Sequence, residues 1–187
     1  DCHMPYRSEG GVKFTNHKIS SPLENVAGSC QVCHRESEKE LIGNVQERQE
    51  KVRQLAGMAE ELLVKAHIET RVALDHGATP EQIKAVHQLI RQAQWRWDFV
   101  VASHGGSFHA PIECARILGN AIEKAAEART ILAGLLGRLG VELPVPMPDI
   151  STKAKAQRYI GLDMAKLEAE KGDFKKRVIA TWGEPAL

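Results

Sequence analysis

Apolar residues recur every three or four positions through most of this chain, but not through its first 34 residues. The longest such segment begins near Glu36 and ends at His76-Gly77-Ala78. Its apolar positions are Leu41, Val45, Val52, Leu55, Ala59, Leu62, Ala66 and Ala73. This spacing predicts one helix of about 40 residues, which would be ~60 Å long. We expect a helix of this length to pack against a partner helix, in the same chain or in a second subunit.

Four shorter helices are predicted after it. The first has Thr79 as its N-cap, Pro80 at its first helical position and Gln82 completing a capping box, and it ends near residue 103. The next extends from Pro111 to Gly140, and the last two cover residues 151–160 and 163–182, after an extended connector at 143–148. The apolar positions of the helix that starts after Thr79 are Ile83, Val86, Ile90, Ala93, Trp97 and Val101. Those of the helix from Pro111 are Cys114, Leu118, Ile122, Ala125, Leu132, Leu136 and Leu139, and those of the helix 163–182 are Met164, Leu167, Phe174, Val178 and Trp182.

No strand pattern of any length appears, so the predicted fold class is all-α. Residues 1–34 are rich in Gly, Pro, Ser, Asn, Cys and His, a composition typical of irregular backbone wrapped around another group. We therefore divide the chain into a ligand-wrapping segment, residues 1–35, and a long-helix region, residues 36–187.

Composition narrows the possible partners. The 25 basic and 24 acidic residues nearly cancel, so no electrostatic field favours nucleic acid. No apolar run approaches the ~20 residues that a membrane span needs. Aromatic residues make up only 5% of the chain, which is few for a compact core and would suit a large flat prosthetic group.

The clearest chemical motif is Cys30-Gln31-Val32-Cys33-His34, a complete Cys-x-x-Cys-His. Two thiols at this spacing can form thioethers with the two vinyl groups of haem c, and the adjacent His can bind the iron. A zinc site would need a second pair of ligands at metal spacing, and none follows Cys33. A thioredoxin-like motif would need a βαβ context, which is not predicted.

The chain opens on Cys2-His3, which has the form of the end of a second such motif. His3 would then bind the iron of a second haem, and the first Cys of its motif would precede residue 1. We accordingly expect the chain to be the C-terminal piece of a longer protein. Haem c is attached outside the cytoplasmic membrane, so a periplasmic location is expected.

A haem iron with a second axial ligand would take it from the remaining His residues. His17 lies in the irregular region, where a distal ligand is easily placed, but a solvent-exposed loop imidazole fits equally. His109 precedes Ala110-Pro111 at a helix start, and His104 at the preceding helix end is its rival. We expect surface imidazoles at His67, His76 and His87.

Other residues are interpreted structurally. Cys114 lies on an apolar helix face and is expected to be a buried small hydrophobe. Trp97 is expected in the core, with Trp95 partly exposed. No hydrolase, phosphate-binding or metalloprotease motif occurs. A haem with His on both faces has no open position, so these residues predict electron transfer rather than catalysis.

The ordered combination of motifs resembles the ammonia-forming, pentahaem cytochrome c nitrite reductases. The resemblance rests on Cys2-His3-Met4-Pro5, Asn16-His17-Lys18-Ile19, the complete Cys-x-x-Cys-His, residues 93–98, residues 102–105, His109-Ala110-Pro111 and residues 148–153. It extends from residue 1 to about Trp182 and covers the C-terminal third to half of such an enzyme. It implies a multihaem segment followed by long helices that pack as a dimerisation bundle.

The resemblance also implies roles for single residues. Cys2 and His3 would be the second thioether and the proximal ligand of the fourth haem, with His109 as its distal ligand. Cys30, Cys33 and His34 would attach the fifth haem. His17 would be the distal ligand of the second haem, whose attachment motif lies upstream.

The family's catalytic residues are outside this sequence. Its catalytic haem is held by Cys-x-x-Cys-Lys, with an Arg, a Tyr, a His and a calcium site nearby, and all of these precede the fourth haem motif. The resemblance therefore implies the six-electron reduction of nitrite to ammonium only for the parent protein. It also implies a homodimer and a quinol-oxidising membrane cytochrome as electron donor.

Two other interpretations stay open at this point. One is a multihaem electron-transfer cytochrome with no catalytic haem anywhere. The other is a helical interaction module whose Cys-x-x-Cys-His binds zinc or nothing.

Overall fold

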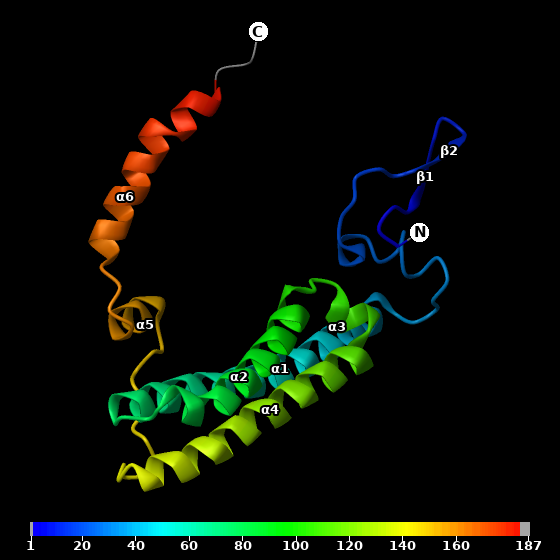
Figure 1. The fold of residues 1–187 in the computed structure, drawn as a ribbon. Coiled ribbons are helices and arrows are strands. Elements are labelled where there is room, and N and C mark those ends of the chain that lie inside the picture. Colours follow the sequence, from blue (N-terminus) through cyan, green and yellow to red (C-terminus); the bar gives the residue numbers. More distant parts are fainter. Residues whose placement is uncertain (1, 184–187) are drawn as a thin grey trace. The chain divides into compact units, whose positions relative to one another are not determined.

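The computed structural model describes residues 2–183 of the 187. The chain forms two compact units, one up to Val145 and one from Pro146. Most of the described residues are helical (Figure 1), which confirms the all-α class. The structure adds one short hairpin that the pattern of apolar positions did not predict.

The hairpin pairs β1 (Tyr6–Glu9) with β2 (Val12–Thr15) in antiparallel register. Its two-residue turn is Gly10-Gly11, and both residues have positive φ, at 56° and 81°. Two central residues with positive φ form the turn that matches the twist of paired strands, and glycine adopts it without steric cost. The Gly-Gly pair was thus a signal for this hairpin. The 3-10 turn η1 (Pro22–Glu24) follows.

The long helix α1 (Glu38–Asp75) starts and ends close to its predicted limits. Ser37 and Glu40 form a capping box, in which each side chain accepts a hydrogen bond from the other residue's backbone N–H. At the other end, Ala78 N–H donates to Ala73 C=O and Gly77 N–H to Leu74 C=O, with Gly77 at φ 87°. This Schellman motif satisfies the last carbonyl groups and reverses the chain.

Helices α2 (Pro80–Ala102) and α4 (Pro111–Arg138) also follow the prediction, including the capping box of Thr79 and Gln82. Between them lies α3 (Gly106–His109), a single helical turn at a position where the sequence predicts a loop. Helices α1, α2 and α4 pack side by side (Figure 1). The three-helix arrangement therefore places the end of α2, with α3, beside the beginning of α1.

The core of this first unit lies between the three helices. Its largest fully buried side chains include Ile83, Leu118 and Leu132. Trp97 packs against both halves of the core, and its indole N–H donates to Ala56 C=O at 3.1 Å, while Trp95 is exposed, as predicted. The prediction was wrong for the last core position of α2, because Val100 is buried and Val101 is 49% exposed.

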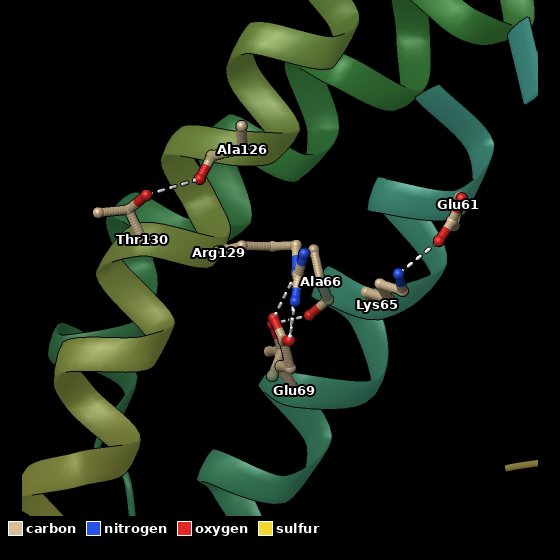
Figure 2. Close-up of polar contacts among 8 residues, drawn as sticks. Glu61, Lys65, Ala66, Glu69, Ala126, Arg129 and Thr130 are labelled. Atoms are coloured by element: carbon tan, nitrogen blue, oxygen red, sulfur yellow. Dashed lines mark hydrogen bonds and ion pairs between the residues drawn. The ribbon is translucent and has the colours of Figure 1, made fainter. Parts of the chain in front are cut away.

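A charged pair crosses this core. Glu69 of α1 accepts three hydrogen bonds from Arg129 of α4, the shortest at 2.6 Å (Figure 2). The Glu69 side chain is 9% exposed and that of Arg129 32%. The hydrogen bonds that Arg129 donates to the Glu69 carboxylate raise the pKa of Arg129. A bidentate geometry of this kind fixes the register of two helices as well as their charge balance.

The second unit contains α5 (Lys153–Tyr159), α6 (Met164–Arg177) and the 3-10 turn η2 (Ile179–Gly183). The predicted helix 163–182 therefore ends earlier than expected. Thr181 donates from both its N–H and its hydroxyl to Val178 C=O, which tightens the chain into a 3-10 turn. Neither α5 nor α6 has a buried residue, and Leu167 and Phe174 are exposed.

Candidate haem-binding site

The Cys-x-x-Cys-His segment forms one closed turn. The N–H groups of Cys33 and His34 both donate to Cys30 C=O, at 3.2 and 2.9 Å. The side chain of Cys30 is half-buried, while those of Cys33 and His34 are exposed. Nδ1 of His34 lies 3.6 Å from a carboxylate oxygen of Glu36. A carboxylate beside Nδ1 orients the ring and leaves Nε2 available to a metal.

The residues before this turn hold it in place. Ser29 Oγ donates to Asn25 C=O at 2.7 Å and to Pro22 C=O at 3.0 Å, and Gln31 N–H donates to Val26 C=O. Val26 is 1% exposed, the one fully buried residue in the described stretch 2–37. The segment is thus ordered by backbone hydrogen bonds rather than by a core of its own.

Several large apolar side chains of this segment are exposed. They are Tyr6, Val12, Phe14, Ile19 and Val32, of which Ile19 is 72% exposed. Exposed apolar surface on a segment with almost no core indicates that another group covers it. A porphyrin, which is large, flat and mostly apolar, fits that requirement.

His3 has a defined tautomer. Its Nδ1 lies 3.1 Å from Ser20 C=O, and since a carbonyl only accepts, Nδ1 must carry the proton. The lone pair then lies on Nε2, the nitrogen that faces away from Ser20. Metal-binding His residues commonly donate their other ring N–H to a backbone carbonyl in this way. Cys2, next to it, is exposed.

His109 ends α3, and two glycines allow its placement. A Cβ on Gly105 would lie 2.9 Å from Cδ2 of His109, so the ring rests directly over the Gly105 backbone. A Cβ on Gly106 would lie 3.1 Å from Cβ of Ser103 and 3.2 Å from Sγ of Cys114. Gly106 therefore lets the turn lie close to Cys114 of α4, and Gly105 leaves room for the His109 ring.

Cys114 is the buried small residue that the sequence predicted, at 5% exposure. Desolvation, followed by the charge of Glu113, raises the pKa of its thiol, so it is held as the neutral thiol. Cys114 supports α3, and through α3 also His109, because its Sγ lies next to Gly106 at the start of α3.

The fold brings His3 and His109 together, although they are far apart in the sequence. Their ring centroids are 6.1 Å apart and their planes are inclined by 46°. Two metal–nitrogen bonds of about 2 Å each, with the ring radii added, place two facing imidazoles about 6 Å apart across one ion. A haem bound between these two rings would find them at a compatible spacing.

The other His residues are not gathered with these. His17 is exposed on the turn after β2, where Asn16 N–H donates to Pro5 C=O and Lys18 N–H to the Asn16 side chain. His104 is exposed at the end of α2. His67, His76 and His87 are exposed on helices or at a helix end, as predicted, with desolvation lowering the pKa of His67.

Some site residues were not identified from the sequence. Ser20 contributes its backbone carbonyl to His3, and Gly105 contributes the absence of a side chain next to His109. The Ser-Ser and Gly-Gly dipeptides indicate turns at these positions but not these contacts. Arg48 lies on α1 with its guanidinium carbon 5.7 Å from the centroid of the Phe108 ring, and Phe108 in turn contacts His109. No local pattern pairs residues that lie so far apart in the sequence.

The site suits haem rather than a bare ion. Within residues 2–183, no group of three or more His, Cys, Asp or Glu side chains is arranged to hold a metal ion. A haem iron needs only two protein ligands, because the porphyrin supplies the other four nitrogens. When bound, haem c supplies a one-electron carrier. Among the described helices, none has the length and apolar character to cross a membrane.

Comparison with known proteins identifies a family of cytochromes c. The family model "Cytochrome c552" matches residues 1–187. Proteins named cytochrome c-552 from Bacteroides fragilis strain YCH46 and Parabacteroides distasonis are each 56% identical over 186 residues, and the one from Porphyromonas gingivalis is 53% identical. The matches cover 100% of this chain and 37–38% of those relatives. The chain thus spans little more than a third of their length.

A solved structure is also similar. The catalytic subunit of cytochrome c nitrite reductase from Desulfovibrio desulfuricans matches with a TM-score of 0.65 and 25% sequence identity. The match covers 75% of this chain and 32% of that one. The catalytic subunit of that enzyme has two calcium sites.

Proposed function

The chain belongs to the cytochrome c552 family, and from this premise we propose that it is the C-terminal, electron-transferring part of an ammonia-forming cytochrome c nitrite reductase. The observation that carries the proposal is the pair His3 and His109, whose ring centroids lie 6.1 Å apart. The similarity to a nitrite reductase structure supports the same conclusion, because that protein has a related fold at 25% identity.

The proposed ligand assignment follows the family pattern. Cys2 and His3 belong to the attachment of the fourth haem, and His109 closes its other face. Cys30, Cys33 and His34 attach the fifth haem. His17 reaches the second haem, attached by residues outside this sequence.

The protein residues control what these haems can do. Ser20 C=O holds the proton on Nδ1 of His3, so that Nε2 is free to bind iron. If His3 and His109 both bind the iron, they would leave it no vacant position for nitrite or water. Iron that keeps both ligands changes little in geometry between its oxidation states, which favours fast electron transfer. We therefore assign this part of the protein to electron supply.

The chemical reaction belongs to the parent protein. Nitrite reduction to ammonium, the catalytic haem and a calcium site are assigned to residues that precede this sequence in the family. The same proposal includes a periplasmic location, a homodimer packed through the long helix α1, and a quinol-oxidising membrane cytochrome as electron donor.

Replacement of the proposed distal ligand tests the assignment directly. In the full-length holoprotein, His109→Ala should convert one haem per chain from low-spin to high-spin and make that haem bind carbon monoxide when reduced. The measurements are electron paramagnetic resonance and carbon monoxide titration. His87→Ala, at an exposed position on α2, is the matched control and should change neither. An unchanged spectrum for His109→Ala would refute the assignment.

The activity is tested separately. The full-length protein should oxidise a reduced viologen dye when nitrite is added and should release ammonium, with six electrons consumed per nitrite. A haem-loaded protein that binds nitrite at no haem and yields no ammonium would instead be an electron-transfer cytochrome. The names of the curated relatives, cytochrome c-552, are compatible with either outcome.

A further inference from the structure

Three of the four proposed His ligands differ in what orients their rings. His3 is held by Ser20 C=O, and His34 lies beside the Glu36 carboxylate. Within the described part of the chain, the His109 ring makes no hydrogen bond. Its orientation depends on packing, from Gly105 beneath the ring and from Phe108 at its edge.

Phe108 is the neighbour that can set the ring angle. Its ring centroid lies 5.4 Å from that of His109, and the planes are inclined by 69°, an edge-to-face contact. Phe108 is itself 39% exposed, so it needs a support of its own. Arg48 of α1 supplies it, with its guanidinium carbon 5.7 Å from the centre of the Phe108 ring.

We propose that Arg48 and Phe108 are positioning residues for the haem bound between His3 and His109: Phe108 holds the His109 ring, and Arg48 holds Phe108 and supplies a positive charge that raises the haem's reduction potential. This inference rests on the ligand assignment made above. It links the long helix α1 to the haem through two side chains, although α1 provides no haem ligand itself.

The charge of Arg48 is available for this role. Two basic residues close to Arg48 on α1 are ion-paired, Lys51 with Glu47 and Arg53 with Glu50. Within residues 2–183, Arg48 forms no ion pair. Ferric haem carries one more positive charge than ferrous haem, so a nearby uncompensated cation disfavours the ferric state. Charge and packing beyond the ligands are known ways in which proteins tune a haem.

Two substitutions of Arg48 separate packing from charge. Arg48→Gln removes the charge, whereas Arg48→Lys keeps the charge but loses the flat guanidinium that covers an aromatic ring. Phe108→Leu keeps the charge and removes the edge contact with His109. Arg53→Gln is the matched control, because it removes the same charge from the same helix at a residue that is paired with Glu50 and does not contact Phe108.

The measurements are made on the full-length holoprotein. A redox titration of the low-spin haem signal should show that Arg48→Gln shifts the equilibrium of this haem three- to tenfold toward the ferric state. At 59 mV per tenfold for one electron, that is a fall of about 30–60 mV in its potential. Arg48→Lys should retain most of the potential. Arg53→Gln should shift the equilibrium less than half as much as Arg48→Gln.

The second measurement reports the His109 bond. Phe108→Leu should raise the fraction of this haem that binds carbon monoxide when reduced at least threefold over the wild-type protein, with Arg48→Lys between the two. Equal redox shifts in Arg48→Gln and Arg53→Gln, or an unchanged carbon monoxide fraction in Phe108→Leu, would overturn the inference. His109→Ala is the reference: if it gains carbon monoxide binding while Phe108→Leu does not, the inference fails but the assignment of His109 as a haem ligand stands.

Discussion

The stretch before α1 and the helical part of the same unit are stabilised in different ways. Helices α1, α2 and α4 bury their own apolar side chains, including Leu118 and Leu132. In residues 2–37 the fully buried residue is Val26, while Tyr6 and Ile19 are exposed. The helices therefore bury apolar side chains against one another, whereas the first stretch would depend on the haem that we propose it binds. Variants in each region can test that difference.

The largest effect should come from loss of haem attachment. In the double variant Cys30→Ser and Cys33→Ser, backbone amides of residues 20–34 should exchange with deuterium about 100-fold faster, because the turns there have no core to hold them. Amides in the middle of α1 and α4 should change less than threefold. Hydrogen-exchange mass spectrometry measures both in one sample. Equal loosening of the helices would contradict the comparison.

A cavity in the helical core should destabilise the three helices, in contrast to the loss of haem attachment. Leu118→Ala removes a side chain with 0% exposure and should lower the free energy of unfolding by about 3 kcal/mol. Ile112→Ala, at a position 86% exposed on the same helix, should cost less than about 0.5 kcal/mol. Urea unfolding followed by far-ultraviolet circular dichroism gives both values, and similar costs for the two variants would argue against a buried α4 face.

The buried ion pair between α1 and α4 should contribute less than the apolar core. Glu69→Gln leaves Arg129 without its charged partner and should cost about 1–3 kcal/mol, less than for a fully buried pair because Arg129 is 32% exposed. Glu61→Gln breaks the exposed pair with Lys65 on the same helix (Figure 2) and should cost under about 0.5 kcal/mol. Urea unfolding compares them, and equal costs would be inconsistent with a structural role for Glu69.

The smallest change in stability, with a clear spectroscopic effect, is expected at the junction of the two regions. Gly105→Ala places a methyl group 2.9 Å from Cδ2 of His109, so the ring must move. The holoprotein should gain a high-spin haem signal, while its unfolding free energy changes by less than about 1 kcal/mol. The control Gly43→Ala, with no atom within 4 Å of the new methyl group, should leave the spectrum unchanged and stabilise α1 slightly.

Prediction from the sequence succeeded where the signals are local. The capping box of the helix starting at residue 80 and the end of the long helix at Gly77 depend on residues within one turn of each other. The burial of Cys114 and the partial burial of Trp97 followed from the helical period. The errors arose where contacts with neighbouring residues decide the local structure. Val100 rather than Val101 faces the core, and Thr181 donates to Val178 C=O, which would otherwise accept the next hydrogen bond of the last helix.

By itself, the sequence determined the all-α class and the ends of the main helices, and it predicted haem attachment by Cys30, Cys33 and His34, because these depend on residue type and short spacing. It named His3 and His109 as separate candidates, joined only by resemblance to a family. Only the tertiary structure placed their rings 6.1 Å apart and set Gly105, Phe108 and Arg48 around them. The physical reason is that residues so far apart in the sequence meet only through the packing of the segment before α1 and the helices α1, α3 and α4 in one unit.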